Sequence, residues 1–503
     1  MFKRIQIFIF LVLLISFFYI TYSIWEGRII GALSIILTIS TILIAILIFL
    51  ENRHPTQTLA WFLVLAAFPI VGFFFYLLFG RNFRKKKMFK EKGELDDQAF
   101  EKIEGNRQVD LSYMEQMGDH QKLLFSLAQK LGNTPISFHT ETKVLTNGDE
   151  TFTYLFKEIK NATDHIHLEY YIVRDDKIGQ ELKELLILKA KEGVKVKFLY
   201  DAVGSWQLSR KYLQELLNAG IEITPFSPVK LPFLNHRINF RNHRKIVVVD
   251  GHIGFVGGLN VGDEYLGRHQ YYGNWRDTHI MLKGEAVRSL QLIFLQDWFY
   301  MTGETHLTAE YLSPPLAYKK DLGGVQLIPG GPDNEWEVIK HVFFSMIVSA
   351  KSSIWIASPY FIPDEDILSA LKVAALSGID VRLLVPNRPD KKIVFYASRS
   401  YFPELLEAGV KIFEYESGFL HSKIIIVDNE LASIGTSNMD MRSFHLNFEV
   451  NAFLYRTNST HTLVNDFLND LANSKRIEWE TFKKRTIWKR MMESTSRLLS
   501  PLL

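Results

Sequence analysis

The sequence predicts a duplicated α/β protein, in which two mixed α/β domains form one pseudo-twofold body behind N-terminal transmembrane helices. Three observations support this fold class. Long apolar runs without charge fill the first 80 residues. Short β-type runs alternate with helical stretches from about residue 133 to 470. Segments from the first part of that region then recur in its second part.

The apolar runs cover residues 5–25, 29–50 and 59–80 and are 21, 22 and 22 residues long. Each is long enough to cross a hydrocarbon core about 30 Å thick as a helix. The stretch "ITYSIWEGR" offers no small-x-small cleavage site, which argues against a cleaved signal peptide. We therefore expect residues 1–80 to form a transmembrane anchor of two to three helices.

Basic residues predict the orientation of this anchor. Five cations lie within residues 81–87, at the start of "GRNFRKKKMFKEK", and the positive-inside tendency places this charged linker (residues 81–132) and the body after it in the cytoplasm. Lys3 and Arg4 favour the same side for the N-terminus, and three full spans cannot satisfy both clusters. The sequence predicts a multi-pass protein of the cell membrane and leaves the number of spans open.

Composition argues against several classes of function. The net charge is only +3 over 503 residues, which argues against a dedicated nucleic-acid binder. Cysteine is absent, so the chain has no disulfide framework, thiol nucleophile or cysteine-type zinc site. The length predicts at least two domains.

The first α/β domain is expected over residues 133–310. "HIHLEYYIV" alternates like a strand, "GQELKELLILKAKEG" is an amphipathic helix, and "VKVKFLYD" is the next strand. A second domain is expected over residues 325–475, because "YLQELLNAGIEI" recurs there as "YFPELLEAGVKI" at an offset of 189. A basic, amphipathic tail follows over residues 476–503.

The most distinctive repeat pairs "NHRKIVVVDGHIGFVGGLN" with "LHSKIIIVDNELASIGTSN". Five chemically distinctive positions match at one common offset of 178. They are His243, Lys245, Asp250, Gly257 and Asn260 in the first copy, and His421, Lys423, Asp428, Gly435 and Asn438 in the second. Chance agreement at all five is remote, so the body is a tandem duplication.

Strand geometry places each histidine and its lysine on one face, because residues i and i+2 of a strand point the same way. Asp250 and Asp428 complete the repeated set of candidate catalytic residues, but their odd spacing turns them off that face and predicts a role in orienting the hairpins. A two-residue hairpin loop would place Gly258 opposite His243 and Thr436 opposite His421. A small residue there would leave room for a ligand, and a hydroxyl could donate to it.

An imidazole beside an ammonium group suits an anionic tetrahedral substrate. The lysines can neutralise oxygens that gain charge in the transition state, and Asn260 and Asn438 can add neutral donors. One histidine would attack phosphorus while the other protonates the leaving oxygen and later deprotonates the incoming alcohol. This chemistry requires neither a metal nor a cofactor.

These residues resemble the phospholipase D superfamily, whose mark is a duplicated H-x-K-x4-D-x6-G-[GST]-x-N. Within it the chain is most similar to the bacterial cardiolipin synthases, through "WFLVLAAFPIVGFFFYLLFGRN", "GGLNVGDEYLG", "NWRDTH" and "SNMDMRSFHLNFEV". The resemblance implies two phospholipase D-type α/β sandwich domains. It also implies that two phosphatidylglycerol molecules become cardiolipin and glycerol through a phosphatidyl-enzyme intermediate.

The resemblance further implies an acidic residue downstream of each motif that orients a catalytic imidazole. This residue falls on Glu449, 28 residues after His421, and on Asp277, 34 residues after His243. The first copy carries Gly258 where many relatives have serine, so one hydroxyl donor is missing there.

Alternatives to this interpretation remain open on sequence grounds. Water could replace the acceptor alcohol, giving a membrane-bound phospholipase D; a membrane-tethered nuclease and a non-catalytic scaffold are further candidates. A symmetric pair of motifs does not reveal the nucleophile, although family analogy favours His243. The basic tail suits either an interfacial helix at anionic lipid or a packing helix, and the sequence is silent on oligomeric state.

Overall fold

The structure is a computed structural model that describes residues 28–50, 55–68, 72, 76, 92–95, 117–228, 239–304, 311–312 and 323–503. The chain divides into two compact units. The first unit comprises residues 1–87 and 231–236, and the second comprises residues 88–230 and 237–503.

The first unit contains two apolar helices, α2 (Arg28–Leu50) and α3 (Pro55–Ala67). Ile48 of α2 and Leu65 of α3 belong to one small buried cluster. Within the described residues, no helix combines the length and the hydropathy needed to cross a membrane. The predicted run at 5–25 lies outside the described residues, and the run at 59–80 is described only in part, so the transmembrane anchor stays a prediction.

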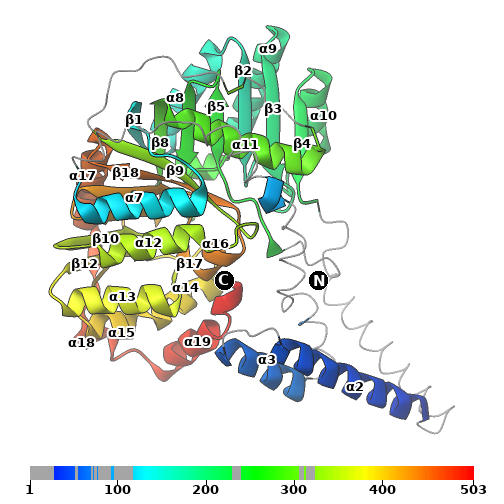
Figure 1. Ribbon diagram of the computed structural model, residues 1–503, viewed down its shortest axis with the longest axis vertical. Coiled ribbons are helices and arrows are strands. Elements are labelled where there is room, and N and C mark those ends of the chain that lie inside the picture. The colour runs from blue at the N-terminus through cyan, green and yellow to red at the C-terminus, as the bar shows by residue number, and fades with distance from the viewer. Residues whose placement is uncertain are drawn as a thin grey trace. The chain divides into compact units, whose positions relative to one another are not determined.

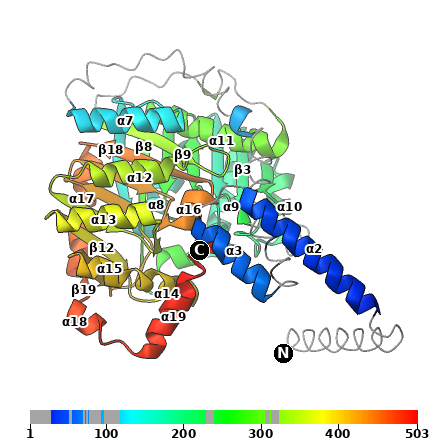
Figure 2. The ribbon, with the colours of Figure 1, turned by 60° about the horizontal axis from the view of Figure 1, so that its bottom comes forward.

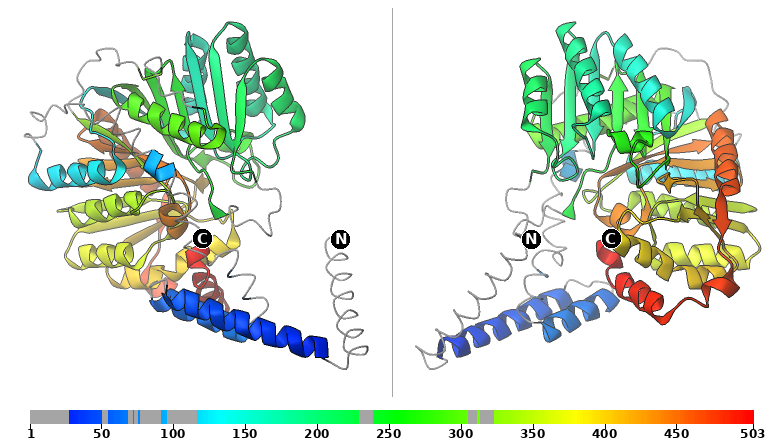
Figure 3. Two further views of the ribbon diagram at one scale, coloured as in Figure 1. Left: turned by 45° about the vertical axis from the view of Figure 1, so that its right-hand side comes forward. Right: turned by 180° about the vertical axis from the view of Figure 1, so that it is seen from behind.

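The second unit holds two mixed sheets with helices on both sides (Figures 1 and 3). The first sheet has the order β1-β8-β6-β5-β2-β3-β4. Its strands are β1 (Thr140–Thr146), β2 (His165–Tyr170), β3 (Lys195–Asp201), β4 (Glu222–Phe226), β5 (Ile246–Val249), β6 (Ile253–Gly257) and β8 (Thr278–Gly284). Strands β2, β3 and β4 run parallel, and the other neighbouring pairs are antiparallel.

The second sheet repeats this topology in the order β9-β18-β16-β15-β10-β12-β13 and adds β19 at the far edge. Its strands are β9 (Gly324–Gly330), β10 (Ser353–Ala357), β12 (Asp380–Pro386), β13 (Lys411–Tyr415), β15 (Ile424–Val427), β16 (Leu431–Gly435), β18 (Glu449–Tyr455) and β19 (Ser474–Arg476). Matching strand order in both sheets confirms the predicted duplication of the mixed α/β fold.

Helices cover both faces of each sheet. In the first half these are α8 (Asn147–Asn161), α9 (Lys177–Lys191), α10 (Arg210–Asn218) and α11 (Ala286–Thr302). In the second half they are α12 (Val338–Val348), α13 (Glu365–Leu376), α14 (Lys392–Ser400), α15 (Phe402–Glu407) and α17 (Asn458–Ala472). Strands β5 ("IVVV") and β15 ("IIIV") are buried on both faces, as such layering requires.

A core shared by both sheets lies where the two halves meet. It contains Val248 of β5 and Phe294 of α11 from the first half, with Ile426 of β15 and Phe467 of α17 from the second. Because one apolar cluster draws on both sheets, the halves form a single body around it.

The segment predicted as a charged linker contributes a helix to the second half. α7 (Asp119–Gly132) buries Leu124, Phe125 and Ala128 on one face. These residues join the core beneath α12 and α13, and Figure 2 shows α7, α12 and α13 side by side. The apolar spacing of α7 was hidden within a charged sequence, which is why the linker prediction missed it.

The predicted hairpin register is wrong by one residue in both halves. A two-residue loop would pair Val249 with His252. In the structure Val249 instead pairs with Ile253, although His252 N donates to Val249 O within the turn. In the second half Val427 pairs with Leu431. Each loop therefore has three residues, and its extra residue moves Gly258 and Thr436 out of the positions expected opposite the histidines.

Candidate active site

Short β-bridges between the two halves bring the repeated motifs together. The first bridge joins Asn242 to Phe448, and His243 N donates to Phe448 O at 2.9 Å. The second pairs β7 (Trp275–Arg276) with β14 (Phe419–Leu420), and His421 N donates to Arg276 O at 2.7 Å. Each histidine thus comes directly after a bridged segment. The partner segment of that bridge, from the opposite half, is directly followed by an acidic residue.

The acidic residues therefore cross over between the halves. Nδ1 of His243 lies 2.9 Å from Glu449 Oε2, and Nδ1 of His421 lies 2.7 Å from Asp277 Oδ2. A carboxylate at Nδ1 fixes the ring and the tautomer that leaves Nε2 available for chemistry. Each histidine keeps only about a tenth of its side chain exposed, 12% for His243 and 11% for His421.

Both motif lysines are buried beside their histidines, as the spacing predicted. Lys245 Nζ donates to His243 O and Lys423 Nζ donates to His421 O, each at 2.6 Å. Burial lowers the pKa of Lys245 to about 7 and that of Lys423 to about 8. Bound anionic phosphate would favour the protonated form of both, so the site is poised to gain positive charge with its substrate.

The pKa values of both imidazoles lie below the ordinary value. Burial is the main cause at His243 and at His421, and repulsion from the neighbouring lysines adds to it. Asp277 partly opposes this effect at His421. In the empty site both rings are therefore neutral near pH 7, which is the form needed for nucleophilic attack.

The two carboxylates differ in charge state. Burial raises the pKa of Glu449 to about 7, with Lys245 opposing the rise. Burial acts on Asp277 in the same direction, but attraction to Lys423 and His421 outweighs it, and the pKa of Asp277 falls below its ordinary value. Asp277 is thus ionised at neutral pH, whereas Glu449 takes up a proton more readily.

A buried guanidinium supports each histidine, and it comes from a different place in each half. Arg244 lies between the histidine and lysine of the first motif, forms an ion pair with Asp297 of α11, and donates to Glu449 O at 3.1 Å. Ser422 holds the matching position in the second motif. There Arg276 fills the role: it donates to Asp470 of α17 at 2.8 Å and reaches Ser422 Oγ at 3.4 Å.

Gly258 and Thr436 do not face a vacant ligand site. A Cβ added at Gly258 would lie 2.0 Å from Asp277 Oδ1, so the glycine provides the space that this carboxylate occupies. Thr436 Oγ1 accepts from Val450 N at 2.9 Å and donates to Val450 O. The space expected for substrate is thus occupied by the Asp277 carboxylate beside Gly258. At Thr436 the hydroxyl is hydrogen-bonded to the backbone of Val450.

Asp250 and Asp428 lie at the end of β5 and β15 remote from the histidines. Asp250 accepts from the backbone amides of residues 163–165, and Asp428 accepts from those of residues 351–353. These contacts tie each hairpin to the start of the neighbouring strand. The geometry agrees with the orienting role that the spacing predicted, and a catalytic role for either aspartate stays a prediction.

The two asparagines make contacts mainly with the protein. Asn260 Oδ1 accepts from Ile172 N at 3.0 Å, and its amide donates to Tyr265 OH at 3.2 Å. Asn438 is buried, its backbone amide donates to Ser443 Oγ, and its Oδ1 has no hydrogen-bond partner among the described residues. Donation from either asparagine to substrate stays a prediction.

Sequence reasoning missed several residues around the site. Tyr171 lies edge-on to His243 and Trp275 lies against His421, with ring centroids 4.9 and 5.0 Å apart. Lys92 is buried and reaches Asp297 at 3.3 Å and Asp333 at 2.7 Å, which links the segment before the body to the ion pair of Arg244. Trp275 and Arg276 could have been found by their position beside Asp277, whereas no sequence signal marked Lys92.

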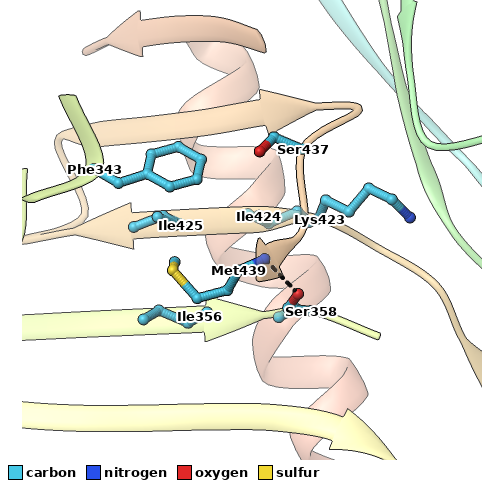
Figure 4. Close-up of a pocket in the computed structure, with 9 residues that line it drawn as sticks. Phe343, Ile356, Ser358, Lys423, Ile424, Ile425, Ser437 and Met439 are labelled. Atoms are coloured by element: carbon cyan, nitrogen blue, oxygen red, sulfur yellow. Dashed lines mark hydrogen bonds between the residues drawn. The ribbon is translucent and has the colours of Figure 1, made fainter. Parts of the chain in front are cut away.

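A cavity of about 10 Å³ lies behind Lys423, lined by Phe343, Ile356, Ile425 and Met439 among others (Figure 4). In Figure 4 the Lys423 side chain extends away from these apolar residues. The cavity has room for about one water molecule and none for a phosphodiester. Among the residues that the structure describes, no cluster of three or more His, Asp or Glu could hold a metal ion.

Comparisons with known proteins agree with the duplicated fold. The family model described as "Cardiolipin synthase, PLD-like domain" matches residues 155–298 and 343–471, and a model for a "Phospholipase_D-nuclease N-terminal" region matches residues 32–81. A crystal structure of phosphatidylserine synthase from Haemophilus influenzae superposes with a TM-score of 0.57 at 15% identity. The match spans 77% of this chain and 100% of the phosphatidylserine synthase chain, and it shows a similarity of fold only.

Curated relatives extend over the whole chain. A cardiolipin synthase from Halalkalibacterium halodurans is 66% identical over 501 residues and covers 100% of both chains. "Cardiolipin synthase 1" from Bacillus anthracis is 45% identical and covers 93% of both. With two repeated motifs, matching sheets and these full-length similarities, the chain belongs to the cardiolipin synthase family of phospholipase D-like proteins.

Proposed function

We propose that this protein transfers a phosphatidyl group from one phosphatidylglycerol molecule to another, releasing glycerol and forming cardiolipin. The observation that carries the proposal is the pair of histidines, each held at Nδ1 by the carboxylate of the opposite half. Two buried lysines beside them supply positive charge for a phosphodiester. Relatives that match the full chain are named for cardiolipin synthesis.

His243 is the proposed nucleophile. Its Nε2 attacks phosphorus, and the bond from phosphorus to the headgroup glycerol oxygen breaks. In the complex with substrate, the anionic phosphodiester and ionised Asp277 both favour protonation of His421. His421 gives this proton to the departing oxygen, so glycerol leaves. The product of this half-reaction is a phosphatidyl group on His243.

The second half-reaction uses the same groups in reverse. Neutral His421 takes a proton from a headgroup hydroxyl of the second phosphatidylglycerol, and the hydroxyl oxygen attacks phosphorus. The phosphorus–nitrogen bond breaks, which restores His243 and releases cardiolipin. The lowered pKa of Asp277 and the raised pKa of Glu449 support this division, because a carboxylate that stays ionised favours the histidine that must carry a proton.

The assignment is tested with a phosphatidyl ester of p-nitrophenol, whose leaving group needs no protonation. We expect His421→Ala to release one equivalent of nitrophenol and to accumulate a phosphatidyl adduct on His243, detected by mass spectrometry. We expect His243→Ala to give no burst. An adduct on His421 in the His243→Ala protein would reverse the roles.

The overall reaction is tested by incubating purified protein with phosphatidylglycerol. We expect cardiolipin and glycerol in equal amounts. Phosphatidic acid without cardiolipin would instead identify water as the acceptor, the alternative that the named relatives do not favour.

The proposed setting is the cell membrane, with residues 1–80 as anchor and the body in the cytoplasm. The three charge-free apolar runs and the basic residues after them support this placement. Protease added to intact right-side-out cells should leave the body uncut, whereas protease added to inverted vesicles should digest it.

A further inference from the structure

The C-terminal helix α19 (Ile487–Arg497) packs on the second half through polar side chains. Glu493 and Ser496 of α19 and Ser500 just after it are buried, with 3%, 5% and 2% of their surface exposed. Arg485 Nε donates to Glu493 Oε2 at 2.7 Å, and the hydroxyls of Tyr401 and Ser500 lie 3.0 Å apart. The face that meets the protein is therefore the hydrophilic one.

The opposite face of α19 is apolar and exposed. At about 3.6 residues per turn, its apolar side chains and that of the next residue, Leu498, occupy one arc of about 140° that contains no charged residue of the helix. The exposed members are Ile487 (65%), Trp488 (73%), Met491 (52%), Met492 (50%) and Leu498 (81%). A helix on the surface of a water-surrounded protein normally has the reverse arrangement.

Cations flank this apolar arc. Lys484, Lys489 and Arg490 are exposed, and residues 483–497 carry six Lys or Arg side chains against the single acidic residue Glu493. An exposed apolar face edged by cations is typical of helices that lie in the headgroup layer of anionic bilayers.

The end of this segment is tied to the candidate active site. Arg442 N donates to Leu503 O at 3.0 Å, and Arg442 Nη2 donates to Asn239 O at 3.0 Å. Arg442 belongs to α16 (Met441–His445), which closely follows Asn438 of the second motif, and Asn239 precedes His243 by four residues. Figures 1 and 2 show α19 beside α14, and the two helices are in contact.

We propose that α19 is an interfacial helix, whose apolar arc inserts into the headgroup region of an anionic phospholipid bilayer while its cations contact lipid phosphates. The cations beside the arc complement the negative charge of an anionic bilayer, whereas a protein surface with few acidic residues would not match them. The docked helix would hold the adjoining part of the second half, including α16 after the second motif, at the membrane surface, where a lipid substrate resides. The choice of lipid as partner rests on the proposed function.

The insertion is measured on the full-length protein in nanodiscs. Because the chain has no cysteine, Met491→Cys introduces a unique site for an environment-sensitive fluorophore. Leu123→Cys is the matched control, since Leu123 is 68% exposed on α7, away from α19 in Figure 2. With brominated phosphatidylglycerol in the bilayer, we expect at least about threefold more quenching at position 491 than at position 123.

Three results would overturn the proposal in this measurement. Equal quenching at both sites would show that α19 does not insert. A probe at position 491 shielded from both brominated lipid and aqueous iodide would show that protein covers the arc. Disulfide-linked dimers of the unlabelled Met491→Cys protein that form equally with and without lipid would make a second copy the occupant. None of these readouts depends on catalysis, so they are distinct from failure of the proposed function.

Two further arms separate charge from apolar contact and link the helix to substrate use. Lys484→Gln and Lys489→Gln should each weaken the insertion about fivefold, with little effect in pure phosphatidylcholine. Trp488→Ser with Leu498→Ser should lower cardiolipin formation from bilayer phosphatidylglycerol by at least about tenfold, while turnover of a dispersed short-chain phosphatidylglycerol falls far less. Equal losses on both substrates would contradict an interfacial role and indicate damage to the fold.

Discussion

The two half-sites share their topology but differ in the groups that surround each histidine. His243 meets Glu449, whose pKa burial raises to about 7, and His421 meets Asp277, whose pKa is lowered by the cations beside it. The supporting guanidinium is Arg244, within the first motif, in one half-site and Arg276, beside the acidic residue, in the other. The two halves thus share their strand order but differ in the charged groups around each histidine.

This difference shows how a symmetric frame can support unequal roles. A nucleophile works as a neutral ring and needs its carboxylate most once it carries phosphorus. An acid–base group must hold a proton from the start, and an ionised partner stabilises that state. The lowered pKa of Asp277 therefore supports the proposed role of His421 as the proton carrier.

The largest expected effect comes from removing the crossed acidic residues. Asp277→Asn and Glu449→Gln should each lower cardiolipin formation by about 10³–10⁴-fold, because each leaves an imidazole without its carboxylate. With the p-nitrophenyl ester, Asp277→Asn should recover most of its initial burst, since that leaving group needs no acid. Glu449→Gln should stay slow with both substrates.

The pattern of recovery distinguishes the two half-sites. If Glu449→Gln recovered with the activated ester and Asp277→Asn did not, the roles of His243 and His421 would be exchanged. Circular dichroism and thermal melting of both variants are the controls for folding.

Small-residue exchanges should have the next largest effect. Gly258→Ser places a Cβ 2.0 Å from the Asp277 carboxylate and should displace it from His421, at a loss of about 100-fold in kcat. Thr436→Ser keeps the hydroxyl that meets Val450 and should change kcat less than about threefold. Equal effects of the two exchanges would contradict the asymmetry.

Loss of either buried guanidinium should reduce stability. Arg244→Met leaves Asp297 without its closest cation, and Arg276→Met does the same to Asp470, so each should cost about 3–5 kcal/mol. Denaturant unfolding in detergent measures this. Asp470→Asn should rescue Arg276→Met more fully than Asp297→Asn rescues Arg244→Met, because Asp297 also meets Lys92.

The pH dependence should be a narrow bell. As pH falls through about 7, Glu449 gains a proton and loses the charge that supports His243. As pH rises through about 7 and then about 8, first Lys245 and then Lys423 lose their positive charge. We expect kcat/KM to fall about tenfold per pH unit beyond each limb. A flat profile from below the first value to above the second would contradict these assignments.

The smallest effect on catalysis is expected at the hairpin aspartates. Asp250→Ala and Asp428→Ala each remove an acceptor for three backbone amides and should lower stability by about 1–3 kcal/mol. Below the melting temperature, activity should stay within about threefold of the unaltered protein. A loss of several hundredfold in a folded variant would place these residues in the catalytic set.

Much of the site followed from one repeated pattern. The i and i+2 spacing of His243 and Lys245 put both on one side of a strand, and the constant offset of 178 located their counterparts. Strand periodicity and the duplication also predicted two mixed sheets. These features are local or repeated, so they are visible in a single sequence.

The features that escaped prediction are long-range. The pairing of His243 with Glu449 depends on the bridge between Asn242 and Phe448, and no local pattern announces it. The hairpin register depended on one extra loop residue, His252, whose presence turn propensity alone does not reveal. Lys92 looked like any cation in a charged stretch, because only the fold brings two aspartates to it.

The crossed β-bridges also bear on how such a chain could arise. Neither half alone contains a histidine together with the carboxylate that orients it. A half-length ancestor with this geometry could complete its sites only as a twofold dimer, in which each subunit supplied its acidic residue to the other. In a single chain the two contributions can differ, and the inequality between Asp277 and Glu449 is a freedom that identical subunits do not have.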